Sequence, residues 1–414
     1  MKLSEVCEFI IDCPHSTAVD EGLGYPLIRT PNVGNGRLIL EDVHRVSEET
    51  YNKRNARAVP QAGDLIFARE APAGNVALIQ EGQEVCLGQR TVLIRPNADK
   101  VDAAFLTYYI LAPEQQYHLL GSANGATVAH VNLPIIRNLE INIPDILTQQ
   151  RISKILTAYD DLIENNQKQI KLLEEAAQRL YKEWFVNLRF PGHEQTKIVD
   201  GVPEGWNICC IEKLISYEVG GGWGEDNPTS NCIEKAYVIR GTDLYSVKQG
   251  KIEGIPCRYH SESSLNARRI CDGDIIFEVS GGSKNTGAGR SLLIRSEILE
   301  LLKLPVMCAS FCKLIRLGDN KLAQYFYDFL QFCKNSGITE KYDKRSASSI
   351  VNYRWKDFLS QEKILIPTKN ILNSYSSFAE ANYHKMMNCA LQISSLQNAR
   401  NRLLPKLMNG EIEI

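Results

Sequence analysis

The chain lacks the residue patterns of a metal site and of a disulfide-stabilised fold. Its 414 residues include 12 cysteines, but none forms a CxxC pair, and the seven histidines are scattered. Structural zinc sites need four closely spaced Cys or His ligands, so the sequence predicts no bound metal. Met1–Glu5 leads into no long apolar run. We therefore expect no signal peptide, and free, buried thiols in a protein of the reducing prokaryotic cytoplasm, with its activity at the nucleoid.

Long apolar runs and a net charge of one sign are also missing. No stretch approaches the about 20 apolar residues that a membrane-spanning helix needs. The formal net charge is −2. Residues 1–145 carry 12 Lys and Arg against 18 Asp and Glu, whereas residues 207–367 carry 22 against 19. Any face that binds nucleic acid must therefore be a local patch and not a basic domain.

Catalytic motifs are absent as well. The adenine-methyltransferase motif Asn-Pro-Pro-aromatic does not occur, and residues 226–229 read Asp-Asn-Pro-Thr. The glycine-rich segment 282–288 has Ala288 where a phosphate-binding loop needs lysine. Asp64 and Asp274 each follow a glycine and open an apolar strand, so we expect their carboxylates to cap local amides. The sequence predicts no active site in this chain.

Two long amphipathic stretches are present, and both are typical of helices. Apolar residues recur in steps of three and four through residues 146–184 and again through 372–403, which is the a/d pattern of a coiled coil. Pro144 and Pro191 flank the first stretch, Pro367 precedes the second, and Pro405 interrupts the second near its end. The expected helix-pairing residues are Ile152, Leu156, Tyr159, Ile163, Asn166, Ile170, Leu173, Leu180, Leu372, Tyr375, Asn382, Met386, Ile393, Leu396 and Leu403.

Each stretch is too long for the core of an ordinary domain. A helix of about 37 residues is about 55 Å long and needs a partner along its length. The other helix is the obvious partner, and an antiparallel pair is favoured because the intervening chain must fold and return. Asn166 and Asn382 occupy matched stripe positions, where we expect opposed amides to fix the register.

The remaining segments form an internal repeat. Residues 25–29 (YPLIR) resemble 236–240 (AYVIR), and residues 63–67 (GDLIF) resemble 273–277 (GDIIF). Branched and aromatic runs predict strands at 25–30, 64–68, 75–79, 91–95 and 139–143, and apolar spacing predicts helices at 103–111 and 322–333. The sequence thus predicts two pseudo-repeated α+β domains in tandem, with mostly antiparallel sheets, each followed by a long helix.

Glycine-rich loops carry the residue types that contact phosphates and base edges. The candidate DNA contacts are Arg29, Asn32, Asn35, Arg37, Arg69, Arg90, Ser122, Asn124 and Thr127 in the first half, and Arg240, Ser283, Lys284, Asn285, Arg290, Lys341, Lys344, Arg345 and Ser346 in the second. Two arginine pairs, Arg29 with Arg240 and Arg95 with Arg316, recur in both halves. Recurrence suits a shared structural ion pair better than a sequence-reading role, because the two halves should read different sequences.

The arrangement resembles the specificity subunit of type I restriction-modification systems. The resemblance lies in residues 143–152 (IPDILTQQRI), 160–166 (DDLIENN), 180–185 (LYKEWF) and 403–412 (LLPKLMNGEI). It implies target recognition domains at 1–145 and 191–367, a central conserved helix at 146–190 and a C-terminal conserved helix at 368–414, with the two helices forming an antiparallel coiled coil.

The same resemblance implies a function. Each domain would read one half of a bipartite, asymmetric site in double-stranded DNA, and the helices would fix the spacer and dock two modification subunits. S-adenosylmethionine would belong to those subunits, and ATP and Mg²⁺ to the restriction subunits, of which two are expected. This chain would bind no cofactor and catalyse nothing. Two alternatives stay open: a protein-binding coiled-coil scaffold, and a DNA-modifying enzyme with its own active site.

Overall fold

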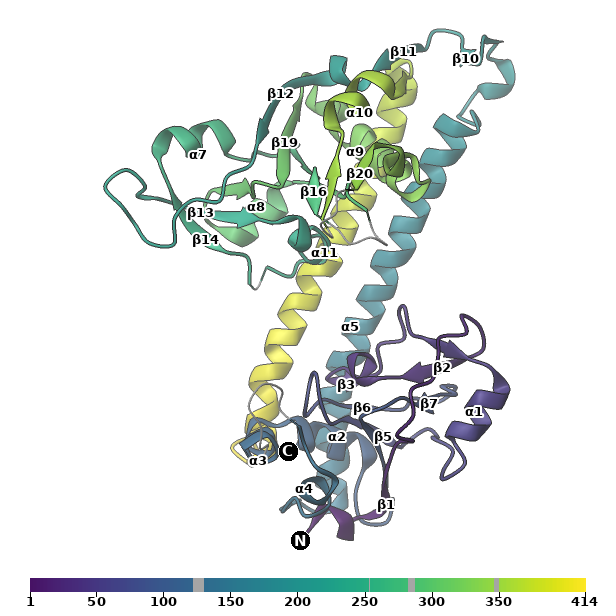
Figure 1. The fold of residues 1–414 in the computed structure, drawn as a ribbon, viewed down its shortest axis with the longest axis vertical. Coiled ribbons are helices and arrows are strands. Elements are labelled where there is room, and N and C mark those ends of the chain that lie inside the picture. Colours follow the sequence, from purple (N-terminus) through teal and green to yellow (C-terminus); the bar gives the residue numbers. More distant parts are fainter. Residues whose placement is uncertain (122–129, 253, 282–286, 346–349) are drawn as a thin grey trace. The chain divides into compact units, whose positions relative to one another are not determined.

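The chain divides into two compact units that share two long helices. The computed structural model describes residues 1–121, 130–252, 254–281, 287–345 and 350–414 (Figure 1). Unit 1 comprises Met1–Glu164 and Ser395–Ile414, and unit 2 comprises Asn165–Ser394. The boundary crosses α5 (Ile146–Tyr181) and α11 (Lys369–Met408), so each unit holds a globular part and a portion of both helices.

Unit 1 is built on two sheets. Its five-stranded sheet has the order β1-β8-β5-β6-β3, and its three-stranded sheet has the order β4-β2-β7. The strands are β1 (Cys7–Asp12), β2 (Tyr25–Ile28), β3 (Gly36–Arg37), β4 (Arg45–Val46), β5 (Leu65–Ala68), β6 (Val76–Leu78), β7 (Cys86–Leu87) and β8 (Thr91–Pro96). The helices besides α5 and α11 are α1 (Glu48–Arg54), α2 (Ala103–Leu111), α3 (Pro113–Gly121) and α4 (Leu133–Arg137).

Strand β5 shows why this segment is apolar throughout. Leu65 and Phe67 join one apolar cluster, which includes α2 and the start of α5, whereas Ile66 and Ala68 join a second cluster. Successive side chains of a strand point to opposite faces, so both faces of β5 are buried. The sheet therefore lies between two cores of unit 1.

Unit 2 repeats this plan with additional strands. Its sheets have the orders β12-β19-β15-β17, β14-β13-β18, β16-β21-β20, β11-β22 and β10-β9. The strands are β9 (Ile198–Val199), β10 (Val202–Pro203), β11 (Asn207–Cys210), β12 (Ile215–Gly220), β13 (Glu234–Ile239), β14 (Cys257–His260), β15 (Ile275–Glu278), β16 (Ser280–Gly281), β17 (Ser291–Leu293), β18 (Val306–Cys308), β19 (Cys312–Leu317), β20 (Asp343–Arg345), β21 (Val351–Tyr353) and β22 (Lys363–Ile366). The helices are α6 (Leu244–Lys248), α7 (Glu262–Arg268), α8 (Ser296–Leu302), α9 (Ala323–Asn335) and α10 (Trp355–Gln361).

The two units share their sheet topology strand by strand. The order β1-β8-β5-β6 in unit 1 matches β12-β19-β15-β17 in unit 2. Both first pairs carry an irregularity in the same place, between Cys7 and Phe9 and between Ile215 and Tyr217. Both units also contain a parallel pair, β2 with β7 and β13 with β18. The strand and helix predictions at 64–68, 75–79, 91–95, 103–111 and 322–333 are confirmed to within two residues.

One predicted strand is wrong. Residues 139–143 form a single bridge, between Glu140 and Lys2, and no strand. The repeat counterpart, β22, pairs with β11, whose residues directly precede the 3₁₀ helix Ile211–Leu214. In unit 1, Lys2 directly precedes the corresponding 3₁₀ helix, Leu3–Glu5, and pairs with Glu140 in a single bridge.

Helices α5 and α11 contact each other within each unit. In unit 1, Ile152, Leu156 and Leu407 share one apolar cluster, and Arg400 forms an ion pair with Asp160. In unit 2 the Asn382 amide donates to the Leu173 carbonyl oxygen at 3.1 Å. Figure 1 shows both helices in full. All fifteen expected helix-pairing residues are buried or half-buried.

Two details of the helices differ from the sequence prediction. Asn382 lies opposite Leu173 and Cys389 opposite Gln169, so Asn166 and Asn382 are not opposed. Compared with an arrangement in which the two amides face each other, α11 is shifted along α5 by about two helical turns. The packing of all the apolar residues along the two helices sets this register, and one amide pair does not. Pro405 does not interrupt α11, which continues to Met408, because a proline in the last turn removes only one backbone hydrogen bond.

The remaining composition-based expectations concern thiols and membranes. All twelve cysteines are free, six of them are buried, and Cys271 is exposed. Among the described residues, no helix is both long enough and apolar enough to cross a membrane.

Candidate nucleic-acid interface

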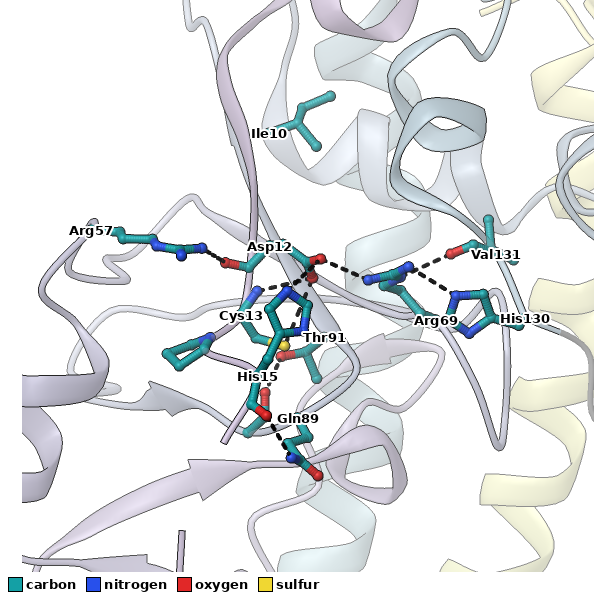
Figure 2. Close-up of polar contacts among 12 residues, drawn as sticks. Ile10, Asp12, Cys13, His15, Arg57, Arg69, Gln89, Thr91, His130 and Val131 are labelled. Carbon is teal, nitrogen blue, oxygen red and sulfur yellow. Dashed lines mark hydrogen bonds and ion pairs between the residues drawn. The ribbon is translucent and has the colours of Figure 1, made fainter. Parts of the chain in front are cut away.

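Charged side chains gather at one edge of the five-stranded sheet of unit 1 (Figure 2). Asp12 ends β1, Arg69 and Glu70 directly follow β5, and Arg90 directly precedes β8. Because β8 is antiparallel to both β1 and β5, its start lies beside their ends. The topology therefore brings together residues that are up to 78 positions apart in the chain. We call these four residues, together with His15, Arg57 and His130 that contact them, the sheet-edge cluster.

Arg69 is the centre of the sheet-edge cluster. Its Nη1 lies 2.7 Å from an Asp12 carboxylate oxygen, its Nη2 lies 2.8 Å from the His130 Nε2, and its Nε donates to the Val131 carbonyl oxygen at 3.0 Å (Figure 2). The side chain is only 11% exposed. These bonds tie the 130–131 segment to β5, so Arg69 is engaged by its own chain.

The outer members of the cluster are open to solvent. Arg90 is 61% exposed and lies 3.0 Å from Glu70, and His15 is 73% exposed and lies 3.5 Å from Asp12. The Arg57 guanidinium donates to the Asp12 carbonyl oxygen at 3.3 Å (Figure 2). Cations held by partly shared carboxylates at an exposed edge suit contact with a polyanion. Of these residues, only Arg69 and Arg90 were predicted.

Sequence reasoning missed Asp12, His15, Arg57, Glu70 and His130. They lie on four separate segments, and no spacing links them. Only the strand order of the sheet, which is a long-range property, could have indicated that they meet.

The corresponding edge of unit 2 carries a different set of side chains. Arg290 donates to both oxygens of the buried Glu278 carboxylate, at 2.8 and 2.5 Å. Lys313 and the Trp355 indole nitrogen bond to Glu218, at 3.3 and 2.7 Å. The equivalent sheets of the two units thus carry different side chains at the corresponding edge, as expected if each unit reads a different sequence.

The recurrent pair of Arg95 and Arg316 is structural, as predicted. The Arg95 guanidinium bonds both Asp64 oxygens, at 2.8 and 2.7 Å, and Arg316 bonds both Asp274 oxygens at 2.7 Å. The predicted capping is also confirmed, because both carboxylates accept backbone N–H groups, from Gln61 and from Cys271. The carboxylates are 1% exposed.

The other recurrent pair behaves differently in the two units. Arg240 bonds Asp243 through Nε and Nη2, both at 2.8 Å, and these bonds raise the pKa of the Arg240 guanidinium. Arg29 forms no such pair, so that prediction is wrong for Arg29. The reason is local: the residue three positions after Arg29 is Asn32, a neutral amide.

The structure also places the other candidate residues. Asn32 is buried and bonds the Arg29 backbone nitrogen and the Ile39 carbonyl oxygen. Arg37 pairs with Asp161 at 2.6 Å. Asn35, Lys341 and Lys344 are exposed, and Arg345 belongs to β20. The candidates outside the described residues are Ser122, Asn124, Thr127, Ser283, Lys284, Asn285 and Ser346. Within the described ranges, no three Cys, His, Asp or Glu side chains are grouped as metal ligands.

Comparison with known proteins agrees with the architecture. Residues 1–175 match the family model of the type I restriction modification DNA specificity domain. The chain is 23% identical over 429 residues to the type I restriction enzyme MjaIX specificity subunit of Methanocaldococcus jannaschii, with 100% of this chain and 93% of that protein covered. It is 22% identical to the HindI specificity subunit of Haemophilus influenzae, covering 93% of this chain and 94% of that protein.

A solved structure has the same fold. The S subunit of a type I restriction-modification system from M. genitalium matches with a TM-score of 0.57 at 13% identity, covering 98% of this chain and 95% of that one. The match to the type I restriction modification DNA specificity domain covers the N-terminal part of the chain. The matches to type I restriction-modification specificity subunits extend along the whole chain.

Proposed function

We propose that this chain gives a type I restriction-modification complex its sequence specificity, and that the globular part of each unit reads one half of a bipartite, asymmetric DNA site. The observation that carries this proposal is the repeated sheet topology with different side chains at the corresponding edge. Two domains with the same sheet topology and different side chains at the corresponding edge could bind DNA in the same geometry and recognise different base sequences. The whole-length similarity to specificity subunits supports it.

The long helices are proposed to set the unread spacer. Helix α5 has 36 residues and α11 has 40. At 1.5 Å per residue α5 is about 54 Å long, which corresponds to about 16 base pairs at about 3.4 Å each. Half-sites in successive major grooves are separated on this scale. In this proposal the two helices form an antiparallel coiled coil along their whole length.

The catalytic work is proposed to belong to partner subunits. Two modification subunits would dock on the helices and methylate adenine with S-adenosylmethionine, and two restriction subunits would bring ATP and Mg²⁺. Methyl transfer to a base requires that the base leave the duplex stack, and an enclosed pocket must receive it. The absence of an adenine-methyltransferase motif from the sequence supports a non-catalytic role for this chain.

Methylation mapping tests the proposal. The chain is expressed with the modification subunit encoded beside it, and methylated adenines are read across a host genome. The expected result is one motif with two short halves and a fixed gap. A contiguous motif, or none when the partner is present and active, would contradict the reading of two half-sites.

A matched pair of variants tests the spacer. Deletion of one heptad from both helices keeps the apolar stripe in register and shortens each by about 10 Å, so the gap should shorten by about three base pairs or methylation should be lost. Deletion of the heptad from α11 alone is the control, since it mismatches the helices and should destabilise the chain. An unchanged gap in an active double deletion would contradict the role of the helices.

A further inference from the structure

Arg29 and Arg240 occupy the same position of the repeat. Each directly follows the middle strand of its three-stranded sheet, β2 or β13, and precedes a 3₁₀ helix, Thr30–Asn32 or Gly241–Asp243. In both units the third residue of this helix accepts a hydrogen bond from the arginine backbone nitrogen, at 3.2 Å for Asn32 and 2.9 Å for Asp243. The backbones therefore match, and only the side chains differ.

The side chains have different partners. In unit 2, Asp243 binds the Arg240 guanidinium through two bonds and neutralises it. In unit 1, Asn32 has no charge, and its amide nitrogen donates to the Ile39 carbonyl oxygen. The Arg29 Nε is buried without a hydrogen-bond partner. Among the described residues, no carboxylate bonds the Arg29 side chain. A half-buried guanidinium without an anion is costly unless a ligand supplies one.

A second difference directs Arg29 across the neighbouring strand. Gly88 follows β7 as Ala309 follows β18, and both backbone nitrogens donate to the residue before the arginine, at 2.7 and 2.9 Å. A Cβ at Gly88 would lie 2.8 Å from the Cγ of Arg29. The stem of Arg29 thus fills the space that a methyl group occupies in unit 2. Glycine at this position leaves room for the arginine stem beside the strand β7.

The surroundings of Arg29 leave its charge available. Asp20 is influenced by the charge of Arg29, but it is exposed and already accepts backbone N–H groups from Gly22 and Arg45 at 3.0 Å. Those two bonds are the main reason that its pKa is lowered, and Arg29 contributes least. Arg90, two residues beyond Gly88, is 61% exposed. Arg29 therefore differs from Arg90, which pairs with Glu70, because no described carboxylate forms a hydrogen bond or an ion pair with the Arg29 side chain.

We infer that Arg29 binds a phosphate of the DNA backbone, and that Arg240, its repeat counterpart, does not. Arg29 is half-buried, with Nε enclosed, so it does not protrude far enough to probe base edges in a groove, whereas a phosphate reaches a guanidinium that is flush with the surface. The paired donors of arginine match two phosphate oxygens. This inference rests on the proposed DNA-binding function and extends it to one residue and one contact.

The test uses the full chain in complex with its modification subunit and fluorescently labelled duplexes. One duplex carries the mapped site and another a scrambled sequence. Anisotropy gives the dissociation constant at several salt concentrations for the parent and for Arg29→Ala, Asn32→Asp and Arg240→Ala. Asn32→Asp installs the carboxylate that neutralises the arginine in unit 2. Melting temperatures of all variants show that they fold.

Arg29→Ala and Asn32→Asp should each weaken binding at least about tenfold, by the same factor on both duplexes. The slope of log affinity against log salt should become shallower by about one. Arg29→Lys, which keeps the charge, should retain most of the slope. Arg240→Ala should change affinity less than about threefold, because its charge is already paired.

Three results would overturn the inference. If the folded Arg29→Ala and Asn32→Asp variants bind DNA like the parent, Arg29 makes no phosphate contact. A loss on the mapped site with unchanged binding to the scrambled duplex would assign Arg29 to base reading. A parent complex that binds neither duplex would refute the proposed function and the inference together, and this separates the two kinds of failure.

Discussion

The two buried ion pairs allow one experiment to be run twice in the same molecule. Asp64 and Asp274 are both 1% exposed, and each is held by two arginine N–H groups and one backbone N–H group. We predict that Arg95→Ala destabilises unit 1 by about 3 kcal/mol, because it leaves a buried carboxylate with a single donor. Arg95 also lies over the Phe9 ring at 4.6 Å, and that contact is lost as well.

The equivalent substitution in unit 2, Arg316→Ala, should lower the stability by a smaller amount. Arg316 is 40% exposed, against 18% for Arg95, so water can approach Asp274 once the guanidinium is removed. We expect about 2 kcal/mol for Arg316→Ala. The double variant Asp64→Asn with Arg95→Met removes the charge and its partner together, and should cost less than Arg95→Ala alone.

Hydrogen exchange measures these effects unit by unit. Urea unfolding of a two-unit chain need not be two-state, so amide exchange in β5 and β15 is the better readout. Arg95→Ala should accelerate exchange in β5, and Arg316→Ala should accelerate it in β15. A cost below about 0.5 kcal/mol for both variants would refute the reasoning that these pairs stabilise the repeat.

Three further predictions concern other parts of the chain. Burial raises the pKa of Asp328 from 3.8 to about 7, so between these pH values the folded chain holds a proton that the unfolded chain has released. The free energy of unfolding should therefore fall by about 2 kcal/mol from pH 5 to pH 7. Unfolding measured across this pH range should show no such loss for Asp328→Asn. Leu156→Ala, at a fully buried position, should cost about 2–5 kcal/mol, whereas Leu162→Ala, at a position that is 51% exposed, should cost less than about 0.5 kcal/mol by thermal unfolding. In the native chain a maleimide should label the exposed Cys271 and spare Cys308, whose pKa is raised to about 12 by burial; equal labelling rates by mass spectrometry would contradict the fold there.

Much of the fold could be predicted because its signals are local. Steps of three and four along the chain indicate which residues of α5 and α11 are buried. The Gly-Asp-apolar segments at 63–67 and 273–277 predicted both the strands and the capped carboxylates. These features depend on neighbours within about five residues, so the order of residues is sufficient to identify them.

The candidate interface was less predictable. Arginine type and loop position selected Arg69 and Arg90 as candidate DNA contacts, but did not predict that they lie at one edge with Asp12 and His130. Several predicted arginines are paired with carboxylates that the packed fold brings to them, as Arg69 is with Asp12 and Arg290 with Glu278. Pairing of that kind depends on strand register, which a single sequence does not specify.

The sequence by itself determined the two long helices, the internal repeat, the buried ion pairs of Arg95 and Arg316, and the resemblance to a family. Tertiary structure decided the register of α5 against α11, the membership of the sheet-edge cluster, and the difference between Arg29 and Arg240. The physical reason is range: periodicity and turn chemistry act between near neighbours, whereas the partner of a charge is whichever group the packed sheet brings within about 3 Å. One neutral residue, Asn32 in place of the aspartate found in unit 2, is enough to leave the Arg29 guanidinium without the carboxylate partner that Arg240 has.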